Sequence, residues 1–176
     1  MYAHPAPPVR VSVSTLPPVA RFNLRISPCD LAEASRAFGL NLPDRIKRSV
    51  SRKDRAAWCL GPDEWLLHGP QVEQAAIVAA FAAMRASVPH SLTVISDREI
   101  TIGISGPGAV DLLSVGIPID LAHLPPGTGQ RTVFDCAQVV LIRDGAQDFR
   151  VEVRRSFFPY VRERLETARA ELTDGC

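Results

Sequence analysis

The chain has 176 residues, of which 46% are hydrophobic and 22% are charged, so its composition excludes wholesale disorder. A domain usually holds about 100–200 residues, and this length therefore predicts one domain or two small halves. Twenty Lys and Arg against nineteen Asp and Glu leave a net charge of +1, which gives no global field for attracting nucleic acid or a membrane surface. The longest apolar run, 75–84, is about half the length of a membrane span, so no transmembrane helix is expected.

The two ends of the chain and its cysteines favour a cytoplasmic protein. Residues 1–19 contain five prolines and no continuous apolar stretch, so we expect an extended leader rather than a signal peptide. The four cysteines lie far apart without a C-x-x-C spacing: Cys29, Cys59, Cys136 and Cys176. Without an export signal we expect reduced thiols that fill small spaces in the core, except for Cys176 in a short tail over 173–176.

Hydrophobic spacing in the first half predicts a strand, a helix, a hairpin and a second helix. Phe22, Leu24 and Ile26 alternate with polar residues, as in a strand with one buried face. The apolar residues of the second helix go most of the way round it, so we expect this Ala-rich helix to be buried or sandwiched. The predicted elements are a strand over 19–26, a helix that starts near Ser27-Pro28 and stops at Gly39, a hairpin of 56–60 and 64–68 around Gly61-Pro62-Asp63, and a helix over 71–88.

The second half repeats this order of elements. The predicted elements are strands over 92–96, 99–104, 132–143 and 149–154, a short helix over 109–115, and a last helix from Ser156 with Phe157, Val161, Leu165, Ala168 and Leu172 on one face. The order strand–helix–strand–strand–helix thus occurs twice, which predicts an α+β fold of two pseudo-repeated units, with antiparallel sheets and helices packed on them. We expect a single domain over 20–172, with halves at about 20–89 and 90–172.

No residue pattern indicates a catalytic, cofactor-binding or metal site, so none is predicted. The four histidines, His4, His68, His90 and His123, stand alone, without the spacing of zinc ligands. The carboxylate pairs Asp63–Glu64 and Asp97–Glu99 lie in or beside turns, where turn geometry and solvated charge explain them. Nothing in their spacing indicates a general acid–base pair.

The loop Ser105-Gly106-Pro107-Gly108 precedes the short helix of the second half. A helix start can attract anions, yet this loop lacks the Lys of a phosphate-binding loop and the third Gly of a dinucleotide fingerprint. We therefore expect Ser105 to cap the helix and Pro107 to lie in its first turn. The Pro- and Gly-rich loop 125–130 gives only weak indications of any function.

Basic residues gather at 45–55, in an interval with few apolar residues. The interval holds no aromatic residue that could stack on a base, so it does not favour binding to nucleic acid. We expect either a solvated face or a rim that meets an acidic partner. Trp58 and Trp65, in the predicted hairpin, are expected to lie in the core or in an interface near it.

A set of short segments carries a family resemblance in one register over about residues 20–170. The segments are Leu60 to Leu67, Ser96-Asp97-Arg98, Ile104-Ser105-Gly106, Asp111-Leu112-Leu113 with Gly116, Ile119-Asp120-Leu121, Arg131-Thr132, Val140 to Arg143, and Phe149 to Ser156. Together they resemble the gamma subunit of bacterial heterotetrameric sarcosine oxidase.

A wider resemblance concerns the stretch from Ser105 to Ser156, which is similar to the opening module of the folate-binding aminomethyltransferase family. In that family an Asn-Asp pair after the short helix helps to hold folate. Here the corresponding place reads Pro118-Ile119-Asp120, without the Asn, and the Gly-rich stretch before the next strand is shortened to 134–137. The Lys-Gly-Cys motif of the related iron–sulfur maintenance proteins is absent too. The resemblance therefore implies a retained scaffold without its folate pocket.

The resemblance to the gamma subunit implies a non-catalytic chain that packs on the alpha subunit and supports an oxidase that demethylates sarcosine to glycine. The beta and delta subunits are further implied partners. FAD, FMN, NAD, tetrahydrofolate and zinc are implied in the partner subunits, and none in this chain. Two alternatives stay open: a subunit of a related N-methyl amino acid demethylase, and a stand-alone folate-binding protein. Neither nucleic acid nor a membrane is an expected partner.

Overall fold

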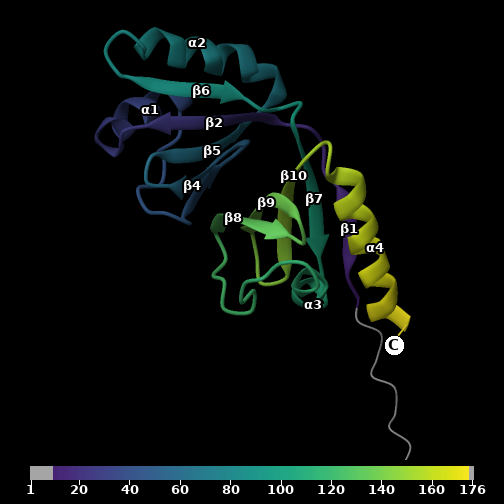
Figure 1. The fold of residues 1–176 in the computed structure, drawn as a ribbon. Helices are drawn as coiled ribbons and strands as arrows, with labels where there is room; N and C mark the ends of the chain where they lie inside the picture. Colours follow the sequence, from purple (N-terminus) through teal and green to yellow (C-terminus); the bar gives the residue numbers. More distant parts are fainter. Residues whose placement is uncertain (1–9, 175–176) are drawn as a thin grey trace, which may run out of the picture. The chain divides into compact units, whose positions relative to one another are not determined.

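The computed structural model describes residues 10–174, and these form two compact units (Figure 1). The N-terminal unit consists of residues 17–99 and 127–130, and the C-terminal unit consists of 10–16, 100–126 and 131–174. The first nine residues of the predicted leader, and Cys176 of the predicted tail, lie outside the described residues. Within 10–174, no helix has the length and the apolar character needed to cross a bilayer.

The N-terminal unit is an antiparallel five-stranded sheet with two α-helices. Its strands follow the order β3-β4-β5-β2-β6 across the sheet. The elements are β2 (Ala20–Ile26), α1 (Leu31–Phe38), β3 (Ser49–Arg52), β4 (Arg55–Gly61), β5 (Glu64–Gly69), α2 (Gln74–Met84) and β6 (His90–Val94), with short 3-10 helices at Pro28–Asp30 and Gln71–Glu73.

The C-terminal unit has the same plan. Its sheet follows the order β1-β7-β10-β9-β8. The elements are β1 (Ser12–Thr15), β7 (Glu99–Ser105), α3 (Ala109–Ser114), β8 (Thr128–Phe134), β9 (Ala137–Arg143), β10 (Asp148–Arg154) and α4 (Phe158–Asp174).

The two sheets match strand for strand when β8, β9, β10, β7 and β1 are compared with β3, β4, β5, β2 and β6. In both units a strand, a helix, three strands and a helix follow one another along the chain. The fifth strand differs in origin, because β6 follows its unit's second helix whereas β1 comes from the beginning of the chain. The predicted α+β fold with two pseudo-repeated units is therefore confirmed, and the sheet of each unit has five strands where the predicted order has three.

Each unit has its own apolar core. In the N-terminal unit, Phe22 and Leu24 of β2 are buried against Phe38 of α1, as the alternating pattern predicts. In the C-terminal unit, Val161 and Leu165 of α4 are buried against the sheet. Burying a large apolar side chain contributes roughly 1.5–3 kcal/mol, so these faces hold each helix on its sheet.

Two strands were not predicted, and one predicted strand is wrong. β1 lies inside the predicted leader and β3 inside the basic interval, where few apolar residues indicate a strand. The predicted strand over 132–143 is divided into β8 and β9 by a turn at Asp135-Cys136. Asp135 has a φ of 49°, the left-handed conformation that lets the chain reverse. Apolar residues lie on both sides of this turn, so the sequence resembles one continuous strand.

The helix predicted over 71–88, which we expected to be buried or sandwiched, has one exposed face in the described part of the N-terminal unit. The α-helical part covers Gln74–Met84, with Ile77 and Phe81 buried against the core of the N-terminal unit. The opposite face, which includes Ala79 and Ala82, is exposed. Tryptophan burial, in contrast, is confirmed: Trp58 and Trp65 are almost fully buried in β4 and β5.

Candidate functional site

The histidines lie in separate places. His68 is buried in β5, His90 begins β6, and His123 is exposed in the loop after α3. His4 lies outside the described residues. Within the part of the chain that the structure describes, no group of three His, Cys, Asp or Glu side chains could hold a metal ion.

Asp120 occupies the position where the aminomethyltransferase resemblance places a folate-holding Asp. Its carboxylate accepts hydrogen bonds from the backbone N–H of His123 over 3.2 Å and pairs with His123 Nδ1 at 2.7 Å. These hydrogen bonds hold the pKa of Asp120 below its ordinary value. Both side chains are largely exposed, and the carboxylate of Asp120 stabilises the loop that contains it.

The two carboxylate pairs singled out in the sequence form local contacts. Asp63 forms an ion pair with Arg25 at 2.6 Å, and Glu64 accepts a hydrogen bond from Asn23 over 2.6 Å. Glu99 pairs with its neighbour Arg98 at 3.0 Å. Turn geometry and surface charge account for these contacts, as the sequence indicated.

The predicted capping role of Ser105 is wrong. Ser105 ends β7, and α3 begins after Gly108, which offers no side-chain cap. Pro107 therefore also lies before the helix and not in its first turn. Gly106 has a φ of 123°, and a Cβ built on it would lie 2.6 Å from the carbonyl oxygen of Arg10. The glycine in this loop thus permits a close approach between two backbone segments.

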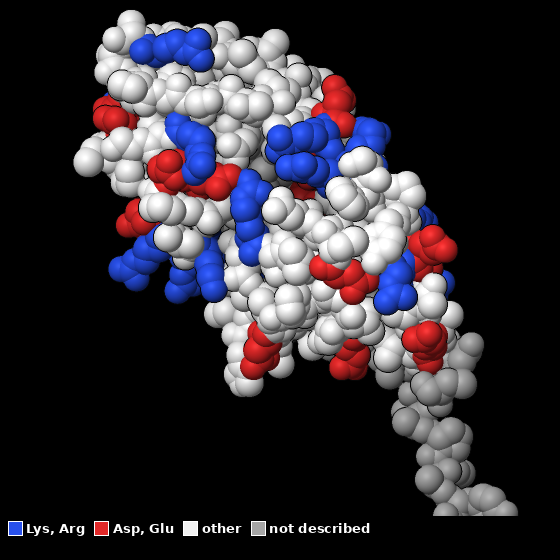
Figure 2. Space-filling view, viewed as in Figure 1, with Lys and Arg blue, Asp and Glu red and all other residues white. Residues whose placement is uncertain are grey.

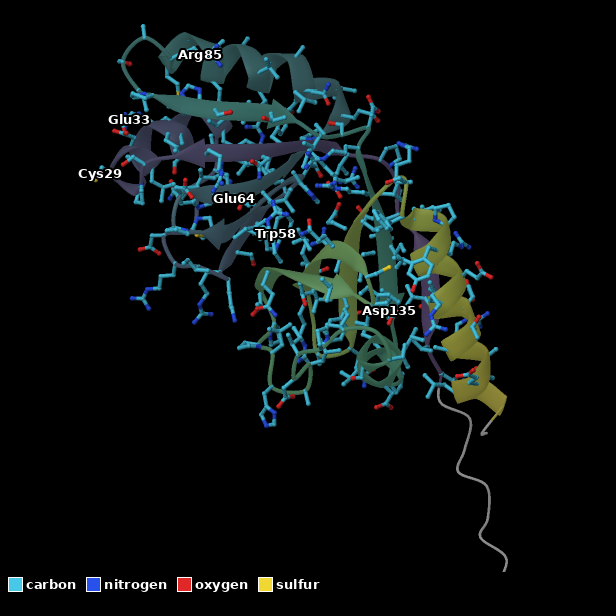
Figure 3. The ribbon with its side chains drawn as sticks, in the orientation of Figure 1. Cys29, Glu33, Trp58, Glu64, Arg85 and Asp135 are labelled. Atoms are coloured by element: carbon cyan, nitrogen blue, oxygen red, sulfur yellow. The ribbon has the colours of Figure 1, made fainter. Side chains whose placement is uncertain are left out.

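The cysteines differ from the expected core positions in two of the three described cases. Cys59 is buried in β4, where burial raises the pKa of its thiol. Cys29 and Cys136 are exposed, and all three are free thiols (Figure 3 labels Cys29). Both exposed cysteines lie in chain reversals, between β2 and α1 and between β8 and β9, and not in the sheets that form the cores.

The basic interval forms an exposed surface of the N-terminal unit, which we call the basic edge. Its five cationic side chains all belong to exposed residues: Arg45, Lys47, Arg48, Arg52 and Lys53. Figure 2 shows a group of blue side chains on the left of the view, about halfway down and below the place that β4 occupies in Figure 1. Arg55 is different, because it is half-buried, pairs with Glu73 and stacks over the ring of Phe38 at 5.3 Å.

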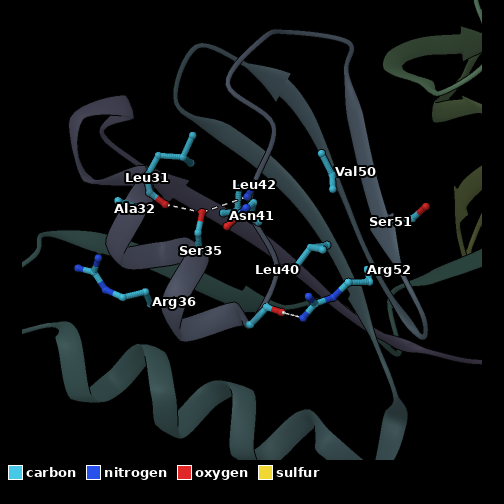
Figure 4. A pocket seen from close by; sticks show the side chains of 11 residues that line it. Leu31, Ala32, Ser35, Arg36, Leu40, Asn41, Leu42, Val50, Ser51 and Arg52 are labelled. Carbon is cyan, nitrogen blue, oxygen red and sulfur yellow. Dashed lines mark hydrogen bonds between the residues drawn. The ribbon is translucent and has the colours of Figure 1, made fainter.

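A pocket of about 680 Å³ adjoins the basic edge, between α1, the loop after it and β3 (Figure 4). Its apolar lining includes Leu31, Leu40 and Val50, and Arg36 and Arg52 also line it. Ser35 fixes one wall, because its hydroxyl donates to Leu31 O over 2.7 Å and accepts from Leu42 N over 3.0 Å. No local sequence pattern indicates this pocket, because three separate segments form it.

The outward face of α2 is an uncharged, apolar surface, which we call the α2 face. The α-helix itself, Gln74–Met84, contains no charged residue. Its exposed members, together with neighbouring residues, are Val72, Ala75, Ala76, Val78, Ala79, Ala82, Ala83 and Ala86. Val72 is 93% exposed. Figure 2 shows this region as white apart from one blue side chain near the position of Arg85, which Figure 3 labels.

The corresponding helix of the C-terminal unit provides an internal comparison. α4 also has one face buried in its sheet, through Val161, Leu165 and Ala168. Its exposed and half-buried positions carry Arg162, Glu163, Arg164, Glu166, Arg169 and Glu171. A helix with a solvated outer face normally has this charged pattern. The α2 face lacks it, although α2 occupies the equivalent place in its unit.

The architecture defines the class of protein first. A structure of the glycine cleavage system aminomethyltransferase T from Bartonella henselae is similar to this chain, with a TM-score of 0.68 and 12% sequence identity. The similarity covers 89% of this chain and 45% of that chain. The protein therefore has an aminomethyltransferase-like fold, and the wider resemblance seen in the sequence is confirmed at the level of the fold.

The family then follows from the sequence. The sequence model of one protein family, described as the sarcosine oxidase, gamma subunit family, matches residues 25–171. The chain belongs to this family. A chain of the heterotetrameric sarcosine oxidase from Corynebacterium sp. U-96, solved in complex with pyrrole 2-carboxylate, has a TM-score of 0.86 and 24% identity. That similarity covers 96% of this chain and 88% of the other. No curated protein sequence matches this one.

Proposed function

We propose that this chain is a non-catalytic subunit of a heterotetrameric sarcosine oxidase, where it packs on the alpha subunit and supports the assembled enzyme. Membership of the gamma subunit family supports a place in that complex. The observation that carries the structural role is the α2 face, an apolar helix surface that no other described part of the N-terminal unit covers.

Exposure of such an apolar helix face to water is energetically unfavourable. A helix that is apolar on all sides is normally buried on all sides. Small side chains such as those of Ala79 and Ala82 also let another protein surface approach the helix backbone closely. The core of a permanent interface is depleted in charged residues, as this face is. The charged outer face of α4 supports the same assignment, because it has no need of a cover.

The reaction belongs, in this proposal, to the assembled oxidase and its large subunits. Sarcosine is demethylated oxidatively to glycine there, with FAD, FMN, NAD, tetrahydrofolate and zinc held by the partner subunits. This chain contributes contact surface, and the local pairing of Asp120 with His123 is in keeping with that division.

The test is co-expression of the full chain with the alpha, beta and delta subunits encoded in the same genome. We expect all four chains to elute together in size-exclusion chromatography, with flavin absorbance and sarcosine oxidation in the same fraction. The purified chain alone should show neither flavin absorbance nor turnover. Sarcosine oxidation by the isolated chain, or its elution apart from an active oxidase, would overturn the proposal.

A second candidate function is folate binding by the chain on its own, which the aminomethyltransferase-like fold favours. Titration of the purified chain with tetrahydrofolate, followed by intrinsic tryptophan fluorescence and calorimetry, separates the two. Micromolar binding supports the second candidate. Absence of binding, together with co-elution in the complex, supports the first.

A further inference from the structure

We propose that the basic edge and the adjoining pocket form a second docking surface, which takes an acidic, extended segment of a partner subunit with one apolar side chain in the pocket. This inference rests on the proposed function, because it assumes that the chain works inside a complex. It adds a second contact of different chemistry to the apolar α2 face.

The basic edge concentrates positive charge in a short segment. The segment 44–54 carries five cationic side chains and two carboxylates, Asp44 and Asp54, in a chain whose total charge is only +1. Among residues 10–174, Arg45, Lys47, Arg48 and Lys53 form no ion pair, whereas Arg55 beside them does. A concentrated surface with an excess of positive charge is complementary to a negatively charged partner and accelerates their association.

Hydrogen bonds hold the backbone of the basic edge in a fixed geometry. The backbone N–H of Lys47 donates to Cys59 O over 2.8 Å, and the carbonyl of Lys47 accepts from Gly129 N over 3.0 Å. Lys47 has a φ of 70°, so this backbone is held in a conformation that non-glycine residues seldom adopt. The hydroxyl of Ser49 donates to Gly127 O over 2.8 Å and anchors the same segment again. A surface ordered in advance loses less conformational entropy when a partner binds.

The apolar pocket beside the cations favours a polypeptide as the occupant. The pocket beside the charges is lined by Leu31, Leu40 and Val50, which suit an aliphatic or aromatic side chain. Ile46, in the same segment as the cations, is 52% exposed and offers a further apolar side chain. Proteins that bind single-stranded nucleic acid combine cations for the phosphates with aromatic side chains that stack on the bases, and segment 44–54 has no aromatic residue. An acidic peptide with an apolar residue satisfies both features.

The edge of the sheet explains why the segment would be extended. β3 lies at one end of the strand order of its sheet. Arg48, just before β3, bridges to Thr128, so among the described residues the open edge is the part of β3 beyond this bridge, where Val50, Ser51 and Arg52 line the pocket. An extended peptide can lie along such an edge and place alternate side chains on opposite sides. Its carboxylates would then face the cations, and its apolar side chain would enter the pocket.

The test compares matched variants in the four-subunit complex. Arg48→Glu/Lys53→Glu reverses two cations of the basic edge, and Ala32→Trp fills the pocket from an exposed position on α1. The control, Arg10→Glu/Arg154→Glu, makes the same change in net charge at two exposed residues of the C-terminal unit. Each complex is captured through a tag on the alpha subunit and washed at increasing salt, from about 50 mM to about 500 mM NaCl. The chain that remains bound is measured, and thermal melting of each purified variant checks folding.

We expect about tenfold less retention for the double reversal and for Ala32→Trp, and wild-type retention for the control. Equal retention of all variants would overturn this inference and leave the proposed function standing. Failure of the wild-type chain to be captured at all would overturn both. Salt-sensitive binding of a short single-stranded oligonucleotide that the double reversal abolishes, with unchanged retention in the complex, would show that the basic edge serves nucleic acid instead.

Discussion

The guanidinium group of Arg143 stacks over the ring of Phe149, with its carbon 5.0 Å from the ring centroid. Arg143 ends β9, and it is 8% exposed. It donates hydrogen bonds to backbone carbonyls of two loops, among them Leu121 O at 2.8 Å and Ala146 O at 2.7 Å. One side chain therefore fixes the loop after α3 and the β9–β10 turn of the C-terminal unit.

We predict that Arg143→Lys lowers the free energy of unfolding by about 3 kcal/mol, because lysine cannot reach these carbonyls together and leaves buried acceptors without donors. The matched control is Arg169→Lys, whose ion pair with Glu166 is partly exposed. The control should cost less than about 1 kcal/mol. Denaturant unfolding measures both, and an equal effect of the two substitutions would contradict the role given to Arg143.

A second prediction concerns Gly129 and Trp58 in the N-terminal unit. A Cβ built on Gly129 would collide with Trp58 Cδ1, and the Trp58 ring is also held edge-on to His68 with centroids 4.8 Å apart. Because the buried indole cannot move aside, Gly129→Ala should destabilise the protein by about 2–3 kcal/mol and change its tryptophan fluorescence.

The control for this prediction is Gly145→Ala. Its added Cβ would meet the end of the flexible Asp148 carboxylate at 2.6 Å. That carboxylate can rotate away, so we expect a loss below about 1 kcal/mol. Unfolding curves in which both alanines behave alike would show that Trp58 has room to move.

Thiol reactivity tests the placement of the cysteines. Cys29 and Cys136 are exposed, whereas burial raises the pKa of Cys59, so its thiolate is scarce at neutral pH. We expect iodoacetamide to label the two exposed cysteines quickly in the native protein, and Cys59 only after unfolding. Mass spectrometry of the peptides gives the rate at each site. Labelling of Cys59 as fast as Cys29 under native conditions would contradict its buried position in β4.

A pH-dependent contact joins α4 to the β8–β9 turn. The hydroxyl of Tyr160 donates to Asp135 Oδ2 over 3.1 Å. Partial burial, and next the hydrogen bond and negative charge of Asp135, raise the pKa of Tyr160 above its ordinary value. Because the folded-state pKa is raised, the stabilising effect is complete below the ordinary pKa of tyrosine and is lost as the pH rises through the folded value.

Ultraviolet titration of the tyrosinate measures this pKa. Tyr2 and Tyr160 are the two tyrosines of the chain, so Tyr2→Phe leaves a single signal. That signal should titrate above the ordinary tyrosine pKa, and Asp135→Asn should shift it part of the way back. Titration of Tyr160 at the ordinary value in the Tyr2→Phe chain is the contradicting result.

The sequence predicts the strands and helices that depend on local pattern, and it fails where a distant partner decides. The alternation in β2 and the spacing of Val161 and Leu165 in α4 directly reflect one buried face. β1 contains a single apolar residue, Val13, and exists because Ser12 to Thr15 pair with β7, about ninety residues further along. The local sequence of β1 therefore does not indicate its pairing with β7.

The candidate surfaces show the same division. The sequence of α2 predicts a helix that needs cover on more than one side, and the structure identifies the side that the described residues of the N-terminal unit leave exposed, marked by Ala79. The run of cations at 45–55 indicates the basic edge in the sequence, and an acidic partner is one of the two roles expected for it. No local pattern indicates the pocket beside it, because Ser35, Leu40 and Val50 come together only when α1, the loop after it and β3 are folded.

The most direct measurement of the central claim replaces one alanine of the α2 face by arginine. Ala79→Arg places a charge in the middle of this face, and Ala170→Arg makes the same change at an exposed position of the charged helix α4. Arginine forms helices nearly as well as alanine, so both variants should fold. If the α2 face packs on the alpha subunit, Ala79→Arg should reduce co-purification with the other oxidase subunits about tenfold or more, while Ala170→Arg co-purifies as the wild type does. Equal co-purification of the two variants would contradict the claim that the α2 face is the contact through which this chain acts.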